Sequence, residues 1–168
     1  MNLVYCCLEP ILSLRLKDYE NLSDNLTGFI FSIEPGLYMV STFLIPYIVP
    51  TWVAHRVTMI TSLFILCIAS LLVGPFFESE NLVSMITGLG ISGFMMGFLC
   101  IPTMPEMIDA CKLAHPNADQ DHANSILSGI FNAAYGLGLS LGPMTGATLY
   151  DLVGFRNTMN IIASLVFI

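Results

Sequence analysis

The stretch GLGLSLGPMTGATLYDLVGFR, residues 136–156, decides the fold of this chain. It closes the longest apolar run without a charge, which begins after His122. Glycines recur at every fourth position, at Gly138, Gly142 and Gly146, so they share one face of a helix. Glycine has no Cβ, so a neighbouring helix can come close to that face, and in lipid such close packing holds helices together. We therefore predict a membrane helix that packs tightly against another.

Pro143 lies inside the same run and supports a location in a membrane. A proline interrupts a helix in water, whereas neighbouring groups in a membrane protein re-satisfy the carbonyl that it leaves unpaired. The apolar run stops at Asp151, and Gly154-Phe155-Arg156 follows. A turn is therefore expected between two helices at this point.

The composition excludes a soluble globular domain. Of the 168 residues, 55% are apolar and 10% are charged, and the mean hydropathy is +0.79. A soluble domain carries about 25% charged residues. The uncharged runs are long enough to span a bilayer, which takes about 20 residues. We predict an all-α, multi-pass membrane protein with the polar stretch 106–122 as its longest connection. The expected helices, of which the first and last are truncated, are 2–16, 28–54, 57–77, 81–105, 123–150 and 157–168.

Charge and motifs exclude several classes of function. The net charge of −7 argues against nucleic acid or an anionic lipid surface as a partner. The five cysteines lack zinc spacing and are interpreted as small buried apolar residues. No Ser-His-Asp, HExxH or P-loop pattern is present, so neither an enzyme, a metal site nor an organic cofactor is expected.

A second set of glycines lies in the segment GLGISG, residues 88–93, and continues to Gly97. The segment matches G-x-G-x-x-G, but a dinucleotide site needs a strand before it and an acidic residue about 20 positions later. Here the segment lies within an uncharged membrane run. We therefore interpret Gly93 and Gly97 as a second face for close helix packing.

Glu9 is the first candidate for a functional residue. It lies in an apolar segment next to Pro10, which leaves a carbonyl group earlier in the helix unpaired. A carboxylate inside a membrane is costly and marks a functional site by default. A low dielectric favours the neutral acid, so Glu9 can hold a proton and a cation in turn. The alternative is a glutamate at the membrane interface.

Three further polar residues fall inside predicted helices. Glu34 lies about two turns into its helix, so it either binds a ligand or reaches toward the membrane surface. Asn132 and Tyr135 lie in the middle of the fifth span. Asparagine at such a position either binds a ligand or forms a hydrogen bond to a neighbouring helix.

Taken together, the apolar runs resemble the C-terminal half of the vesicular amine transporters, a major facilitator family of proton-coupled antiporters. Cys7-Leu-Glu-Pro10 resembles the seventh helix of that family. Residues 93–97 (GFMMG) and 104–107 (MPEM) resemble its tenth helix. Residues 132–146, with the GPxxG step, and the following Gly154-Phe155 resemble the eleventh. The resemblance covers nearly the whole chain.

The resemblance also assigns roles to single residues. It matches Glu9 to a membrane carboxylate of the family. In the monoamine members, aspartates stand where this chain has Cys100 and Asn132. These two departures make polyamine-type members the nearest relatives. The resemblance implies that 16–27 faces the lumen or exterior and that 106–122 faces the cytosol.

We therefore predict most of a six-helix half of a major facilitator transporter, which exchanges organic cations, such as polyamines, for protons. The expected partners are the lipid bilayer, the missing N-terminal half and a small organic cation. A vesicular, endomembrane or plasma membrane location is expected. The main alternative is a non-transporting fragment or assembly partner of a transporter. A membrane-embedded enzyme ranks below both.

Overall fold

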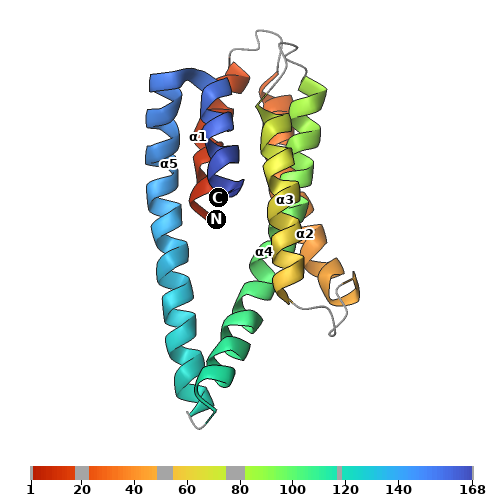
Figure 1. Cartoon of the computed structure of the whole chain (residues 1–168). Coiled ribbons are helices and arrows are strands. Elements are labelled where there is room, and N and C mark those ends of the chain that lie inside the picture. Colours follow the sequence, from red (N-terminus) through yellow and green to blue (C-terminus); the bar gives the residue numbers. More distant parts are fainter. Residues whose placement is uncertain (1, 18–22, 49–54, 75–81, 117–118, 168) are drawn as a thin grey trace.

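The computed structural model describes residues 2–17, 23–48, 55–74, 82–116 and 119–167, and nearly all of these are helical. In Figure 1 the helices stand roughly side by side, and the α4–α5 hairpin extends beyond the others at one end. The five helices of the described residues are α1 (Asn2–Lys17), α2 (Asp24–Ile48), α3 (His55–Val73), α4 (Leu82–Ala114) and α5 (Gln120–Phe167).

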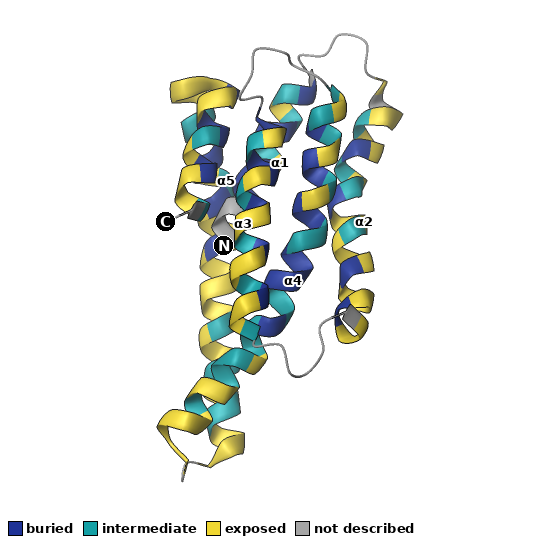
Figure 2. Ribbon diagram, turned by 45° about the vertical axis from the view of Figure 1, so that its right-hand side comes forward, coloured by how far each residue is buried: buried dark blue, intermediate teal, exposed yellow. Residues whose placement is uncertain are grey.

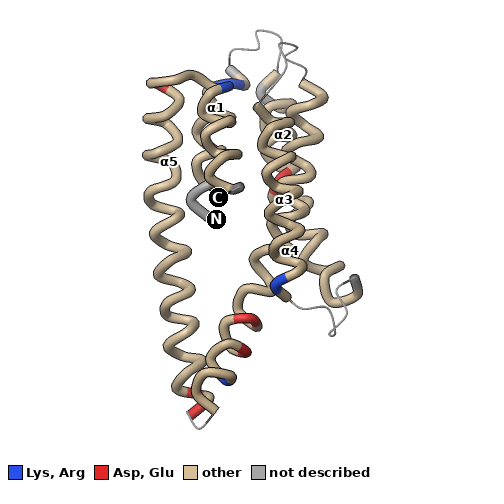
Figure 3. The backbone as a smooth tube through the Cα atoms, in the orientation of Figure 1, with Lys and Arg blue, Asp and Glu red and all other residues tan. Residues whose placement is uncertain are grey.

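Four of these helices, α2 to α5, are long and apolar enough to cross a membrane. Charged residues gather mostly toward the ends of the helices (Figure 3). The outward faces carry many exposed large apolar side chains, among them Phe43, Phe64 and Leu165. Figure 2 shows these exposed faces running along the outside of the bundle. The predicted class, an all-α membrane protein, is confirmed.

Gly154 divides α5 into two helical segments. Its φ of 77° and ψ of 170° are not helical, and a positive φ is strained for residues with a Cβ. The chain reverses there, so the last segment returns beside α1 (Figure 1). The Thr158 hydroxyl, one turn into the new segment, donates to the carbonyl of Gly154 at 2.8 Å. This reversal is where the sequence predicts a turn.

The helices form two groups that meet in one apolar core. Helix α1 packs against α5, while α4 packs against both α2 and α3, and α3 also contacts α5. The core joins all five helices, with Ile11 of α1, Ile30 of α2 and Leu89 of α4 almost fully buried. Met159 and Ile162 of the returning segment complete it. The returning segment of α5 thus connects the two groups.

Helix α4 continues beyond its predicted end at Pro105. It passes through Pro102 and Pro105 and ends at Ala114, so much of the predicted connection 106–122 is helical. Each proline removes one donor, but the residues that follow include Met, Ala, Leu and Lys, which are strong helix formers. Glu106 in this extension pairs with Arg56. Arg56 lies in the first turn of α3, whereas the predicted helices 28–54 and 57–77 left it in the connection between them.

The glycine face of α5 packs against α1. Gly138, Gly142 and Gly146 are all buried, although many of their neighbours in α5 are exposed. The Cys7 thiol of α1 donates to the carbonyl of Gly142 at 3.0 Å. A Cβ added at Gly146 would lie 2.5 Å from the carbonyl oxygen of Cys7. The backbones therefore approach as closely as the sequence pattern predicts, and Pro143 is accommodated within α5.

Candidate functional site

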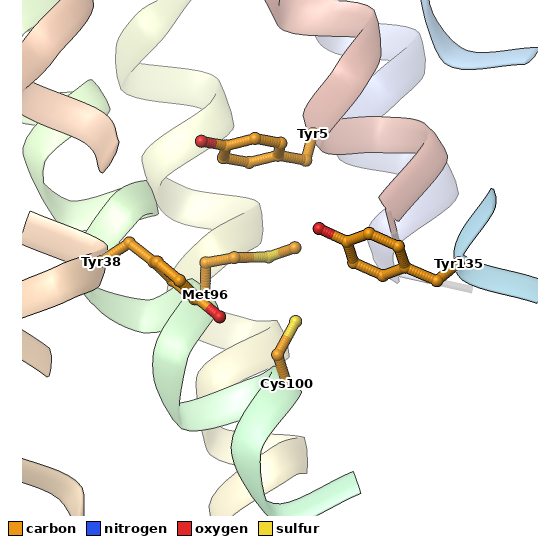
Figure 4. Close-up of a pocket in the computed structure, with 5 residues that line it drawn as sticks. All are labelled: Tyr5, Tyr38, Met96, Cys100 and Tyr135. Carbon is orange, nitrogen blue, oxygen red and sulfur yellow. The ribbon is translucent and has the colours of Figure 1, made fainter. Parts of the chain in front are cut away.

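Four helices line a small cavity between the two groups of the bundle. Its volume is about 70 Å³, and its walls are Tyr5 of α1, Tyr38 of α2, Met96 and Cys100 of α4, and Tyr135 of α5. The three tyrosines approach from different sides and direct their hydroxyl groups into the space between the helices (Figure 4). We call these three residues the tyrosine level. No positively charged side chain lines this cavity in the described part of the chain.

Two carboxylates form a second level next to the tyrosines. Glu9 follows Tyr5 by four residues on α1, and Glu34 precedes Tyr38 by four residues on α2. Residues four apart share a helix face, one turn from each other. Since α1 and α2 run in opposite directions (Figure 1), both carboxylates lie on the same side of the tyrosine level. Glu9 and Glu34 interact electrostatically with each other and with Tyr5.

The two carboxylates have different surroundings. Glu34 is 7% exposed, and its Oε1 lies 2.9 Å from the hydroxyl oxygen of Ser92 on α4. Glu9 is exposed. Glu9 therefore lies on an open face of α1. Cys7, two residues earlier, faces α5, and a step of two residues turns Glu9 to the opposite side of α1.

Glycines on α4 hold Glu34 in its buried position. A Cβ added at Gly93 would overlap the backbone carbonyl of Glu34, and one added at Gly97 would overlap the side chain of Ser41. The backbones of α2 and α4 are therefore in direct contact at the level of Glu34. The carboxyl group has little room to leave this contact unless the helices separate.

A second cavity adjoins the first between α4 and α5. It has a volume of about 270 Å³ and shares Cys100 and Tyr135 with the smaller cavity. Phe131, whose ring stacks on Tyr135 with centroids 6.2 Å apart, lines it together with Leu99, Thr103, Met107, Ile130 and Ala134. Its walls are mainly apolar, whereas the smaller cavity is lined by three tyrosines.

The structure brings together some of the predicted site residues and not others. Cys100 and Tyr135 line both cavities. Glu9 and Glu34 form the neighbouring carboxylate level. Asn132 is exposed on α5 and does not line either cavity. Gly93 and Gly97 pack against α2, as their helical spacing predicts.

Sequence reasoning missed Tyr5, Tyr38 and Met96 as lining residues and Ser92 as the partner of Glu34. The signal for the two tyrosines was present, because each lies four residues from a membrane glutamate. Ser92, Met96 and Cys100 also follow one another at intervals of four. The pairing of Ser92 with Glu34 had no such signal, since it depends on how α2 and α4 align.

Sequence comparison shows which known proteins the chain is similar to. The chain is 27% identical over 155 residues to the MFS-type transporter SLC18B1 of Mus musculus, and 27% identical over 160 residues to that of Homo sapiens. The corresponding rat protein is 28% identical over 155 residues. Each alignment covers 89% of this chain. The chain is therefore similar to part of these major facilitator transporters. This confirms the predicted resemblance to the vesicular amine transporter group of the major facilitator superfamily.

The comparisons also define how far the relationship extends. The chain spans about a third of the length of the curated relatives that it matches. No family model and no solved structure matches it. The matched segment thus corresponds to one part of those longer transporters.

Proposed function

We propose that this chain supplies helices of one half of a major facilitator transporter that exchanges organic cations for protons. The observation that carries the proposal is the cavity lined by Tyr5, Tyr38 and Tyr135 with two carboxylates one helical turn away. Transporters of this fold bind substrate near the middle of the membrane, between their two halves. A cavity shared by four helices at such a position suits a small substrate.

The chemistry of the cavity favours a cation. The faces of tyrosine rings attract ammonium groups, and the attraction is strongest where water is excluded. The nearby carboxylates add negative charge, and neither α2 nor the adjoining part of α4 contains Lys, Arg or His before Lys112. An organic anion would meet no cationic group among the described residues that line the cavity. Protonated amines, including polyamines, are therefore the favoured class of substrate.

Glu9 is the group that we propose to exchange a proton for the cation. It is exposed and shares a helix face with Tyr5, so a cation at the tyrosine level can approach it. A carboxylate that binds either a proton or a cation, but not both, links the two movements. Release of the proton on one side of the membrane then accompanies binding of the amine.

Alternating access requires a second wall for this cavity. In major facilitator proteins, two halves rock against each other around the site. We propose that the partner of this chain is an N-terminal half, and that lipid covers the exposed apolar faces of α2 and α3. The proposed location is a vesicle, another endomembrane or the plasma membrane.

The test is uptake into proteoliposomes that contain the complete transporter, with this chain and an N-terminal half together. A pH gradient, acid inside, should drive saturable uptake of radiolabelled spermidine. Glu9→Gln should abolish the dependence on the gradient, because glutamine cannot release a proton. Uptake that is independent of the gradient, or a preference for organic anions, would contradict the proposal.

The chain on its own provides a control, because it contributes one wall of the cavity. Liposomes with this chain alone should show no saturable uptake. Uptake by the chain alone at the rate of the complete protein would show that the second wall is not needed. A complete protein that folds but transports nothing would favour the alternative of a non-transporting assembly partner.

A further inference from the structure

The hydroxyl group of Ser92 faces two acceptors with a single hydrogen. Its Oγ lies 2.9 Å from Oε1 of Glu34 and 2.9 Å from the backbone carbonyl oxygen of Leu89. A serine hydroxyl can donate one hydrogen bond at a time and can accept others. The carbonyl of Leu89 can only accept. The direction of the hydrogen bond between Ser92 and Glu34 therefore depends on the protonation of Glu34.

Two arrangements satisfy all of these groups. When Glu34 is neutral, its O–H donates to Ser92, and the Ser92 hydroxyl donates to the carbonyl of Leu89. When Glu34 is ionised, the Ser92 hydroxyl turns and donates to the carboxylate. The Leu89 carbonyl then keeps the backbone bond of its own helix. The same heavy atoms in the same positions thus accept both charge states.

The surroundings of Glu34 admit a proton but not an organic cation. The carboxyl group is buried between two helices whose backbones are in contact, so an organic cation cannot reach it without their separation. Among the described residues, the titratable groups that interact electrostatically with it are on α1: Glu9, Tyr5 and Cys6. Helix α4 contributes no titratable side chain between Leu82 and Leu99. No cationic residue of α2 or of this part of α4 is present to pair with an ionised Glu34.

We propose that Glu34 and Ser92 form a second proton-binding site, separate from Glu9, at the contact between α2 and α4. A proton from solvent adds to a carboxylate oxygen of Glu34 and leaves again to solvent, and no other bond forms or breaks. Tyr38 and Met96 of the cavity lie one turn further along the same helices. A change of charge at Glu34 therefore acts on the helix contact that shapes the cavity.

The role of this site in transport rests on the proposed cation exchange, but proton binding itself can be measured without transport. A failure of either idea is therefore distinguishable from a failure of the other. The measurement is pH-difference infrared spectroscopy of this chain in lipid nanodiscs. The signal is the carbonyl stretch of a protonated carboxylic acid, which moves in D₂O and disappears when the acid ionises.

Glu34→Gln should remove one acid band that Glu9→Gln leaves in place. Persistence of every acid band in Glu34→Gln would overturn the proposal. Ser92→Ala should retain the Glu34 band but move it to higher frequency, because the acid loses its hydrogen-bond acceptor. If the Glu34 band does not move in Ser92→Ala, Ser92 is not the hydrogen-bond partner of the acid, and that part of the proposal is wrong.

Ser70→Ala is the matched control for the serine substitution. Ser70 is also buried and donates to the carbonyl of Leu66 four residues earlier, but none of the described carboxylates is its partner. Its substitution should leave the Glu34 band unmoved, and an equal shift in both variants would mean that the shift is not specific. If Glu34→Gln does not fold, the comparison of Ser92→Ala with Ser70→Ala still tests whether an acid next to Ser92 binds a proton.

Discussion

Replacement of Gly146 by alanine tests the close contact between α1 and α5. The added Cβ would lie 2.5 Å from the carbonyl oxygen and 2.9 Å from the Cα of Cys7. Both atoms belong to the backbone of α1, so no side-chain rotation can relieve the overlap, and the helices must move apart. Gly136→Ala is the matched control, since a Cβ at that position of the same helix meets nothing within 4 Å.

The magnitude follows from two opposing terms. Overpacking of a well-packed contact costs about 1–3 kcal/mol, and an obstacle made of backbone places Gly146→Ala at about 3 kcal/mol. Alanine is a better helix former than glycine by about 1 kcal/mol, which offsets part of this cost. We expect a net loss of about 2 kcal/mol, which is about a thirtyfold change in the ratio of folded to unfolded protein. For Gly136→Ala we expect no loss.

The assay is unfolding of the purified chain in mixed micelles with increasing dodecyl sulfate, followed by circular dichroism. Gly146→Ala should unfold at a lower fraction of dodecyl sulfate than the natural chain, whereas Gly136→Ala should not. Equal unfolding of the two variants would refute the argument. It would mean that the α1–α5 contact yields without cost, or that it does not form.

Three further predictions concern α4 and the cavity. Gly93→Ala should destabilise the chain in the same unfolding assay because its Cβ meets the backbone of α2, whereas Gly36→Ala, which meets nothing, should not. Tyr135→Leu should raise the KM for spermidine in the complete transporter about tenfold through loss of its aromatic face, while Tyr135→Phe should keep a KM near the natural value. Glu106→Gln should hardly change the unfolding midpoint, because its partner Arg56 is 68% exposed and exposed ion pairs contribute little. A large loss there would show that the pair fixes α3 to α4.

The patterns that the sequence predicted well are those set by local geometry. Glycines at intervals of four define a helix face whatever surrounds it, so Gly146 and Gly93 were assigned to packing faces correctly. The reversal near Gly154 was equally visible, because an apolar run ended at a charged residue beside a glycine. The end of α4 was harder to predict, since a proline forbids one hydrogen bond but does not determine whether the helix resumes.

The candidate site depended on information that no single helix contains. Whether Glu9 or Glu34 is buried follows from which face of each helix its neighbours cover, and this is a property of the assembled bundle. The sequence placed Glu9 deep in an apolar segment, but the glycine face of α5 packs against the opposite side of α1. Glu34 was the weaker candidate for a functional residue because it lies near the start of its helix. In the bundle α4 covers it, and only 7% of the residue is exposed.

The two carboxylates therefore differ in their accessibility and not in their chemistry. Both lie one turn beyond the tyrosine level, and both have the same side chain. In the proposed exchange, an ammonium group that enters the cavity approaches Glu9, because Glu9 lies on an exposed face of α1. The contact of Gly93 with the backbone of α2 would keep the same group from Glu34, whose Oε1 lies 2.9 Å from the hydroxyl oxygen of Ser92. If a cation binds at Glu9 as we propose, its positive charge favours the ionised form of Glu34, and we expect its binding to promote loss of the proton from Glu34.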